Sequence, residues 1–161
     1  MTARRSLAAR LVRYWAPVLL MIGLMYWFSS DSFSGDRTQS ALDSILSWLF
    51  SGLSRSTVKT ANFVVRKSAH FIEYCLLTAL LYRAFRQDNL PRWHWRWALY
   101  SLAIVVALAF MDEYHQSLTI SREGSIYDSL LDISGGLFAV ALIALFGWRR
   151  DRRDRLAPGG V

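Results

Sequence analysis

The sequence predicts an all-α fold: a four-helix transmembrane bundle with an additional short amphipathic helix on the outer side of the membrane. Hydrophobic residues make up 53% of the 161 residues and gather in four long blocks, while only 19% of the residues are charged. Tryptophans lie at the ends of these blocks, where aromatic rings are enriched in membrane proteins. Most basic residues lie between or beyond the blocks. The net charge of +7 is therefore explained by a membrane, and no nucleic-acid partner is expected.

The four blocks place the spans at about residues 11–28, 62–85, 93–111 and 126–148, with a basic cytoplasmic tail over residues 149–161. The shortest block, about 18 residues, extends roughly 27 Å as a helix, which is enough to cross the hydrocarbon core. The single cysteine excludes a disulfide framework and a zinc site built from cysteines. We therefore expect one membrane domain that covers residues 1–161.

The connection between the first two blocks contains a further helical pattern. Six apolar residues recur with helical spacing while serines occupy the opposite face, and these six are Leu42, Ile45, Leu46, Leu49, Phe50 and Leu53. The pattern predicts an amphipathic helix within Thr38–Ser54. This segment is too short and too polar to span the membrane. We expect it to cover the outer end of the bundle as a lid.

The distribution of Lys and Arg predicts the orientation of the bundle. Thirteen of the 19 basic residues flank the first block, separate the second from the third, or follow the fourth, and the remaining six lie in or beside the other two connections. Because cytoplasmic loops carry the excess of Lys and Arg, both termini and the central loop are expected in the cytoplasm. The sequence thus predicts a multi-pass protein of the bacterial inner (cytoplasmic) membrane.

Ionisable residues from three separate stretches converge on the outer side in this topology. They lie in the first turns of the second span, at the end of the third span, and around the start of the fourth. The candidate polar site comprises Arg66, Lys67, His70, Glu73, Asp112, Glu113, His115, Gln116, Arg122, Asp128 and Asp132. An isolated charge inside the bilayer costs about 3 kcal/mol or more, so these groups should face the bundle interior and form a polar cup. Gly135 and Gly136 would permit close helix approach beside it.

Three motifs in this site resemble the VanZ-like integral membrane protein family. RKSAHFIEY at 66–74, DEYHQ at 112–116 and REGSIYD at 122–128 match the family's R-K-x-x-H-F-x-E-Y, D-E-x-H-Q and R-x-G-S-x-x-D patterns in the same order. The resemblance covers about residues 15–148 and implies that the site residues named above form the family's polar motif. The family takes its name from a protein linked to low-level resistance to the glycopeptide teicoplanin. This implies a role at the cell envelope or in the antibiotic response.

Three interpretations of the polar site follow from these residues. In the first, the site binds or modifies a polar envelope molecule, such as a lipid headgroup or a lipid-linked or glycopeptide-related ligand. Arg66, Lys67 and Arg122 would then hold a phosphate or carboxylate of that molecule. In the second, the protein is a membrane hydrolase or transferase that uses His70 or Glu73 as a general base, or a divalent metal held by the site. In the third, the charges form a purely structural ion-pair network in a membrane scaffold or a small transporter subunit.

The residues alone do not decide among these interpretations. The candidate catalytic residues are His70, Glu73, Asp112 and Asp128, but neither a nucleophile motif nor a glycine-rich phosphate loop accompanies them. We therefore assign no cofactor, keep a divalent metal as an option, and expect membrane lipids as partners. Enzymatic activity and oligomeric state are left open.

Overall fold

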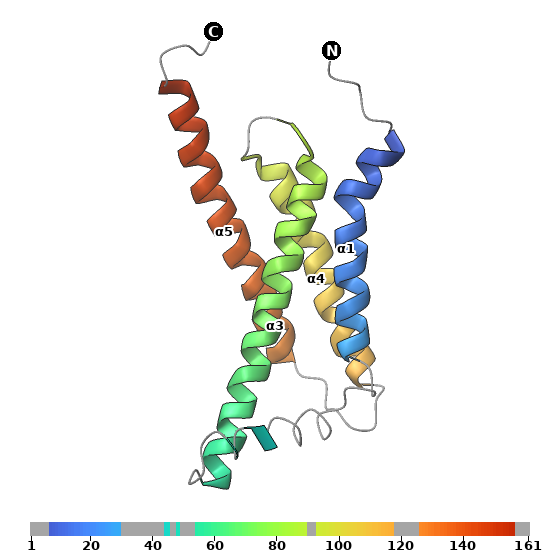
Figure 1. The fold of residues 1–161 in the computed structure, drawn as a ribbon, viewed down its shortest axis with the longest axis vertical. Coiled ribbons are helices and arrows are strands. Elements are labelled where there is room, and N and C mark those ends of the chain that lie inside the picture. The colour runs from blue at the N-terminus through green and yellow to red at the C-terminus, as the bar shows by residue number, and fades with distance from the viewer. Residues whose placement is uncertain are drawn as a thin grey trace.

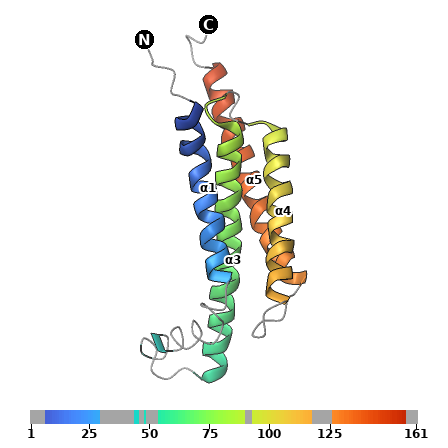
Figure 2. The same cartoon turned by 90° about the vertical axis from the view of Figure 1, so that its right-hand side faces the viewer.

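The computed structural model describes residues 7–29, 44–45, 48, 54–89, 93–117 and 126–156. Four long helices contain most of them: α1 (Leu7–Ser29), α3 (Arg55–Arg86), α4 (Trp95–Ser117) and α5 (Ile126–Leu156). The helices run along one common long axis (Figure 1, Figure 2). The start of α1, the connection from α3 to α4 and the end of α5 lie at one end of the bundle, which we call the termini end. The end of α4 and the start of α5 lie at the opposite end, which we call the cluster end.

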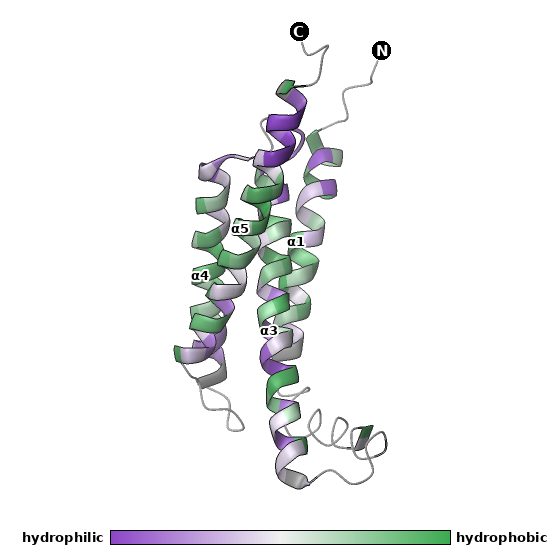
Figure 3. Ribbon diagram, turned by 90° about the vertical axis from the view of Figure 1, so that its left-hand side faces the viewer, coloured by the Kyte–Doolittle hydropathy of each residue, from purple (hydrophilic) through white to green (hydrophobic). Residues whose placement is uncertain are grey.

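Three of the four long helices are apolar enough to cross a membrane, and their candidate spans are Leu7–Trp27, Trp95–His115 and Ile126–Asp154. Many of their large apolar side chains point outward: Leu19 and Leu20, for example, are each 66% exposed. Hydrocarbon, unlike water, is a favourable surrounding for such a surface. Figure 3 shows the apolar stretches of the helices between more polar ends. Charged residues interrupt the first half of α3, so its crossing of the membrane stays a prediction.

The helices extend beyond the predicted spans. α3 begins at Arg55 because Ser54 caps it, and the Ser54 hydroxyl accepts a hydrogen bond from the Thr57 backbone N–H at 3.2 Å. α5 continues to Leu156, so much of the basic segment that we expected as a separate tail from Arg149 onward is helical. Oppositely charged residues four positions apart in this segment favour the helix.

The predicted amphipathic helix within Thr38–Ser54 lies mostly outside the described residues. Ser44, Ile45 and Trp48 are helical, but the amphipathic helix as a whole stays a prediction. The loop before α5, which carries Arg122, also lies outside the described residues.

α3 lies at the centre of the bundle and contacts α1, α4 and α5. Its buried side chains Leu77 and Leu81 form one hydrophobic core with Val18 of α1 and Val105 of α4. Burial of these apolar side chains stabilises the central position of α3. The apolar second half of α3 thus holds the bundle together, and the same packing brings its polar first half to the cluster end.

Two glycines set the close approach of α5 to α3. A Cβ atom at Gly135 would clash with the Phe71 carbonyl oxygen and lie 3.2 Å from its carbonyl carbon, and a Cβ at Gly136 would lie 3.0 Å from Thr78 Oγ1. At Gly135 only glycine permits such proximity to the Phe71 backbone, so the predicted close approach is confirmed. Because Asp132 lies one helical turn before Gly135, this contact sets α5 carboxylates beside the polar half of α3.

Direct side-chain contacts fasten the termini end. The Tyr14 hydroxyl of α1 donates a hydrogen bond to the carboxylate of Asp88, which follows α3. Arg10 donates to the side-chain oxygen of Gln87 at 2.6 Å. These bonds join the first half of α1 to the turn after α3.

Candidate functional site

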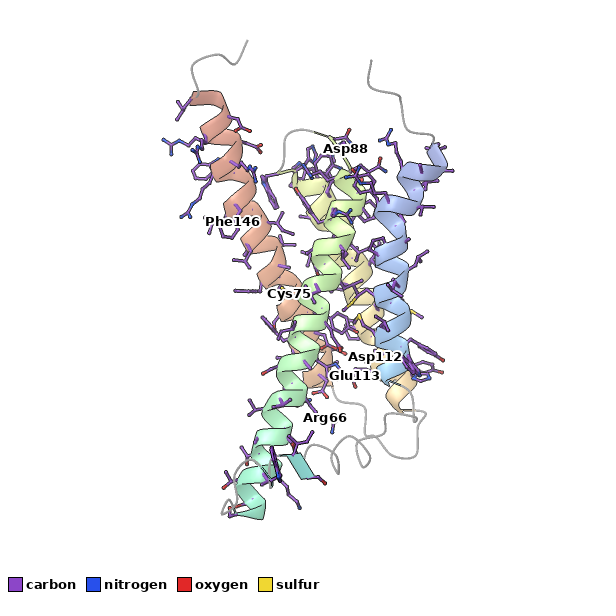
Figure 4. The ribbon with its side chains drawn as sticks, viewed as in Figure 1. Arg66, Cys75, Asp88, Asp112, Glu113 and Phe146 are labelled. Carbon is purple, nitrogen blue, oxygen red and sulfur yellow. The ribbon has the colours of Figure 1, made fainter. Side chains whose placement is uncertain are left out.

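Seven ionisable side chains from three helices gather at the cluster end. We call them the polar cluster: Lys67, His70 and Glu73 from α3, Asp112 and Glu113 from α4, and Asp128 and Asp132 from α5. Electrostatic interactions connect Asp132 with members on all three helices, namely Lys67, Asp112, Glu113 and Asp128. In Figure 4, Asp112 and Glu113 lie together at the cluster end, far from Asp88 at the termini end. The structure therefore brings together residues that are far apart in the sequence.

Asp132 is the most deeply buried member of the polar cluster. Its side chain is 1% exposed, and its Oδ1 atom lies 3.7 Å from His70 Nδ1. This distance is too long for a hydrogen bond. Among the described residues, Asp132 Oδ1 has no hydrogen-bond partner. A buried carboxylate oxygen without a partner is costly, and such groups occur where a site has a further occupant or a chemical role.

Lys67 forms an ion pair with Asp128 across the contact between α3 and α5. The Lys67 ammonium also lies 5.3 Å from the centre of the Phe63 ring, within the range of a cation–π interaction. Both partners of the ion pair are about a quarter to a third exposed. Lys67 is therefore engaged by a carboxylate of the protein itself, which reduces its capacity to hold an anionic ligand.

Carboxylates outnumber cations in the polar cluster. Five of its seven members are Asp or Glu, and Lys67 is its one permanent cation. Arg66, which we predicted as a site residue, is exposed and lies below Asp112 and Glu113 in the view of Figure 4. Excess negative charge in a weakly solvated place requires protons or a cation. The cluster as described is thus better suited to a cationic occupant than to a bare anion.

Three members of the polar cluster have the residue types and spacing of metal ligands. His70, Asp112 and Asp132 each offer one ligand atom, and these atoms all lie within 4.8 Å of one another. Imidazole nitrogen and carboxylate oxygen are the donors of many zinc and manganese sites. We call this group the His-Asp-Asp triad.

An apolar cavity adjoins the polar cluster between α1 and α4. It has a volume of about 570 Å³, and most of its wall consists of apolar side chains such as Leu19, Ile22, Leu108 and Met111. Its polar wall includes Asp112, which also belongs to the His-Asp-Asp triad. A mostly apolar pocket with a few polar groups on one side is the usual form of a site for an amphipathic ligand.

The remaining predicted site residues have different positions. His115 lines the cavity rather than the triad, and its ring lies 5.1 Å from that of Tyr26 on α1. Glu73 is half-buried and interacts electrostatically with Asp112. Gln116 belongs to the last turn of α4, but its side chain lies outside the described part of the chain, as does all of Arg122.

Sequence reasoning missed the contribution of α1 to the site. Leu19, Gly23 and Tyr26 line the cavity from α1, and their spacing of four and three places them on one helical face. That spacing was the available signal, but an apolar face of a spanning helix is compatible with lipid as well as with a neighbouring helix. Ser129 was also missed: it is buried, and its hydroxyl donates to the Ala109 carbonyl oxygen at 3.4 Å, joining α5 to α4.

Helices with an apolar exterior and a group of partly buried charged side chains at one end define a helical membrane protein with a polar site between its helices. Comparison with known proteins identifies the family. The model of the VanZ/LLP1 family matches residues 14–147, and the chain belongs to this family, which confirms the resemblance of its motifs. Neither a curated protein nor a solved structure matches the chain.

Proposed function

We propose that this VanZ-like membrane protein binds a lipid-linked polar molecule of the bacterial cell envelope. The observation that carries the proposal is the shared position of Asp112, which lines the apolar cavity and belongs to the polar cluster. Hydrocarbon of the ligand would occupy the cavity, and its polar head would lie beside the cluster. The hydrocarbon would then contact apolar side chains, and the polar head would contact charged ones, which is favourable for both.

The proposal also covers the orientation of the bundle in the membrane and a crossing of the membrane by α3. The excess of Lys and Arg at the termini end supports a cytoplasmic position for both termini, which turns the cluster end outward in the inner membrane. The central position of α3 among helices that are apolar enough to span supports a crossing by α3 as well. An outward site matches precursors and headgroups of the outer leaflet, and a change in the response to teicoplanin-type glycopeptides would follow from binding them.

A cavity-filling substitution tests the proposed function. Gly23 lines the cavity, and no atom lies within 4 Å of a Cβ built on it, so we expect the ring of Gly23→Phe to occupy the cavity. Leu20→Phe is the matched control, because Leu20 is 66% exposed and is not among the residues that line the cavity. The measurement is native mass spectrometry of protein extracted from bacterial membranes with its surrounding lipids.

We expect wild type and Leu20→Phe to retain the same lipid-linked molecule, and Gly23→Phe to retain less than about a tenth of it, a loss of roughly 1.4 kcal/mol or more in binding. Equal retention by Gly23→Phe would contradict the proposal, provided that the variant is folded by circular dichroism. Loss in both variants would point to nonspecific lipid on α1 instead.

An enzyme is the second candidate function. The observation that favours it is the imidazole of His70, which lies 3.7 Å from the buried carboxylate of Asp132. A carboxylate beside an imidazole orients a general base. The same mass spectra separate the two functions: a ligand that is bound and released keeps its mass during incubation, whereas a hydrolase or transferase changes it.

A further inference from the structure

We propose that the His-Asp-Asp triad, His70, Asp112 and Asp132, binds a divalent transition-metal cation of the Zn²⁺ or Mn²⁺ type. The three residues come from α3, α4 and α5, so the ion would join three helices at the cluster end. The proposal goes beyond the proposed binding function, because it requires neither the cavity nor a lipid-linked ligand.

Distances within the triad fit an ion between the side chains. His70 Nδ1 and Asp132 Oδ1 are 3.7 Å apart, and two tetrahedral ligands at about 2.1 Å from a metal are roughly 3.4 Å apart. One ligand atom of Asp112 lies within 4.8 Å of the other two. A small rotation of the Asp112 side chain brings it into the same coordination sphere, since a carboxylate turns readily about its χ angles.

The buried carboxylate supplies an independent reason for an occupant. Asp132 is 1% exposed, and its Oδ1 atom has no hydrogen-bond partner among the described residues. A buried carboxylate requires a partner of opposite charge or a metal. Lys67 interacts with Asp132 electrostatically, but its ammonium forms its ion pair with Asp128, and His70 Nδ1 is 3.7 Å away from Asp132 Oδ1.

The charge of the polar cluster supports the same conclusion. Asp132 interacts electrostatically with three further carboxylates, those of Asp112, Glu113 and Asp128. A divalent cation beside Asp132 would neutralise much of this repulsion at the place with the least access to solvent.

The donor set selects the type of metal. One imidazole and two carboxylates favour Zn²⁺ or Mn²⁺ over Ca²⁺, which binds oxygen ligands, and over Cu(I), which prefers sulfur. Three protein ligands also leave at least one coordination position open. Because Asp112 lines the cavity as well, an open position beside it would accept a phosphate or carboxylate oxygen of an anionic head. The ion would thus make an acidic cluster competent to hold an anion.

Metal binding to the full-length protein tests the proposal. The protein is purified in detergent without a histidine tag, stripped with a chelator and titrated with Zn²⁺ and Mn²⁺, with bound metal measured by elemental analysis and calorimetry. We expect one ion per chain. We expect His70→Gln and Asp132→Asn each to weaken binding at least about 100-fold, since even partners beyond the ligand shell contribute 10–100-fold to metal affinity.

Glu113→Gln is the charge-matched comparison, because it removes one negative charge from the polar cluster without removing a ligand. We expect it to weaken binding less than about tenfold. Electron paramagnetic resonance of bound Mn²⁺ gives a second readout: a nitrogen coupling from imidazole should be present in wild type and Glu113→Gln and absent in His70→Gln. This readout remains decisive if Asp132→Asn fails to fold.

Absence of stoichiometric metal in the titrated wild type would overturn the proposal. Equal losses in Glu113→Gln and Asp132→Asn would also overturn it, because they would indicate diffuse attraction by negative charge. The Gly23→Phe experiment is independent of these outcomes, since that substitution fills the cavity and leaves the triad intact.

Discussion

The two ends of the bundle differ in how their polar side chains are paired. At the termini end, two side-chain hydrogen bonds join α1 to the turn after α3: Tyr14 donates to Asp88, and Arg10 donates to Gln87, although Arg10 Nε has no hydrogen-bond partner among the described residues. At the cluster end, carboxylates exceed cations within the polar cluster, and a buried oxygen of Asp132 has no hydrogen-bond partner among the described residues. The difference indicates that polar groups at the termini end stabilise the contact between α1 and the turn after α3, whereas the excess carboxylates of the polar cluster lower the stability of the fold. Such a cost is expected where a protein binds something.

We expect the largest effect on stability at the contact between α5 and α3 beside Gly135. This contact supports the polar cluster but contains none of its residues. Gly135→Ala should force α5 away from the Phe71 backbone of α3 and lower the free energy of unfolding by about 2–3 kcal/mol, because overpacking against backbone cannot relax. The measurement is chemical or thermal unfolding in detergent, followed by helix content.

Gly23→Ala is the control for Gly135→Ala, since it makes the same substitution in a spanning helix with open space around the new methyl group. It should leave stability unchanged or raise it by about 0.5–1 kcal/mol, as alanine does in helices. If the two variants are equally stable, α3 and α5 are not in the close contact described above.

A smaller effect is expected at the termini end. Tyr14→Phe removes the hydroxyl that donates to Asp88 and should lower the free energy of unfolding by about 1.5–2 kcal/mol, in the lower part of the usual range for a hydrogen bond to a charged group. Tyr127→Phe is the matched control, because Tyr127 is 77% exposed and its hydroxyl should contribute little. A loss no greater than that of the control would mean that this bond does not fasten α1, and the contrast between the ends would weaken.

Much of the architecture could be predicted from the sequence, because lipid imposes strong conditions on composition. Long apolar blocks predicted the helices, and the cost of charge in hydrocarbon predicted that residues of three helices, such as His70, Asp112 and Asp132, would meet. The family resemblance was confirmed. Seven of the eleven predicted site residues lie together in the polar cluster, but their role stays a prediction.

Other features could not be predicted, because they depend on how the helices rotate and where they end. Helical spacing places Arg66 and His70 on one face, yet Arg66 is exposed whereas His70 is partly buried. Several carboxylates were available to Lys67, and only the contact between α3 and α5 selects Asp128. The cavity required α1 to present one particular apolar face to α4, and hydrophobic periodicity alone does not identify the face that does so.

The most direct test of the contrast is the stability of Asp132→Asn in metal-free, lipid-free detergent. If the carboxylates of the polar cluster serve to bind a ligand, removal of this buried carboxylate should relieve repulsion and desolvation. The free energy of unfolding should then change by less than about 0.5 kcal/mol or rise by up to about 1 kcal/mol. If the cluster is instead a structural ion-pair network, the same substitution should lower the free energy of unfolding by about 3 kcal/mol or more. That loss would contradict the account.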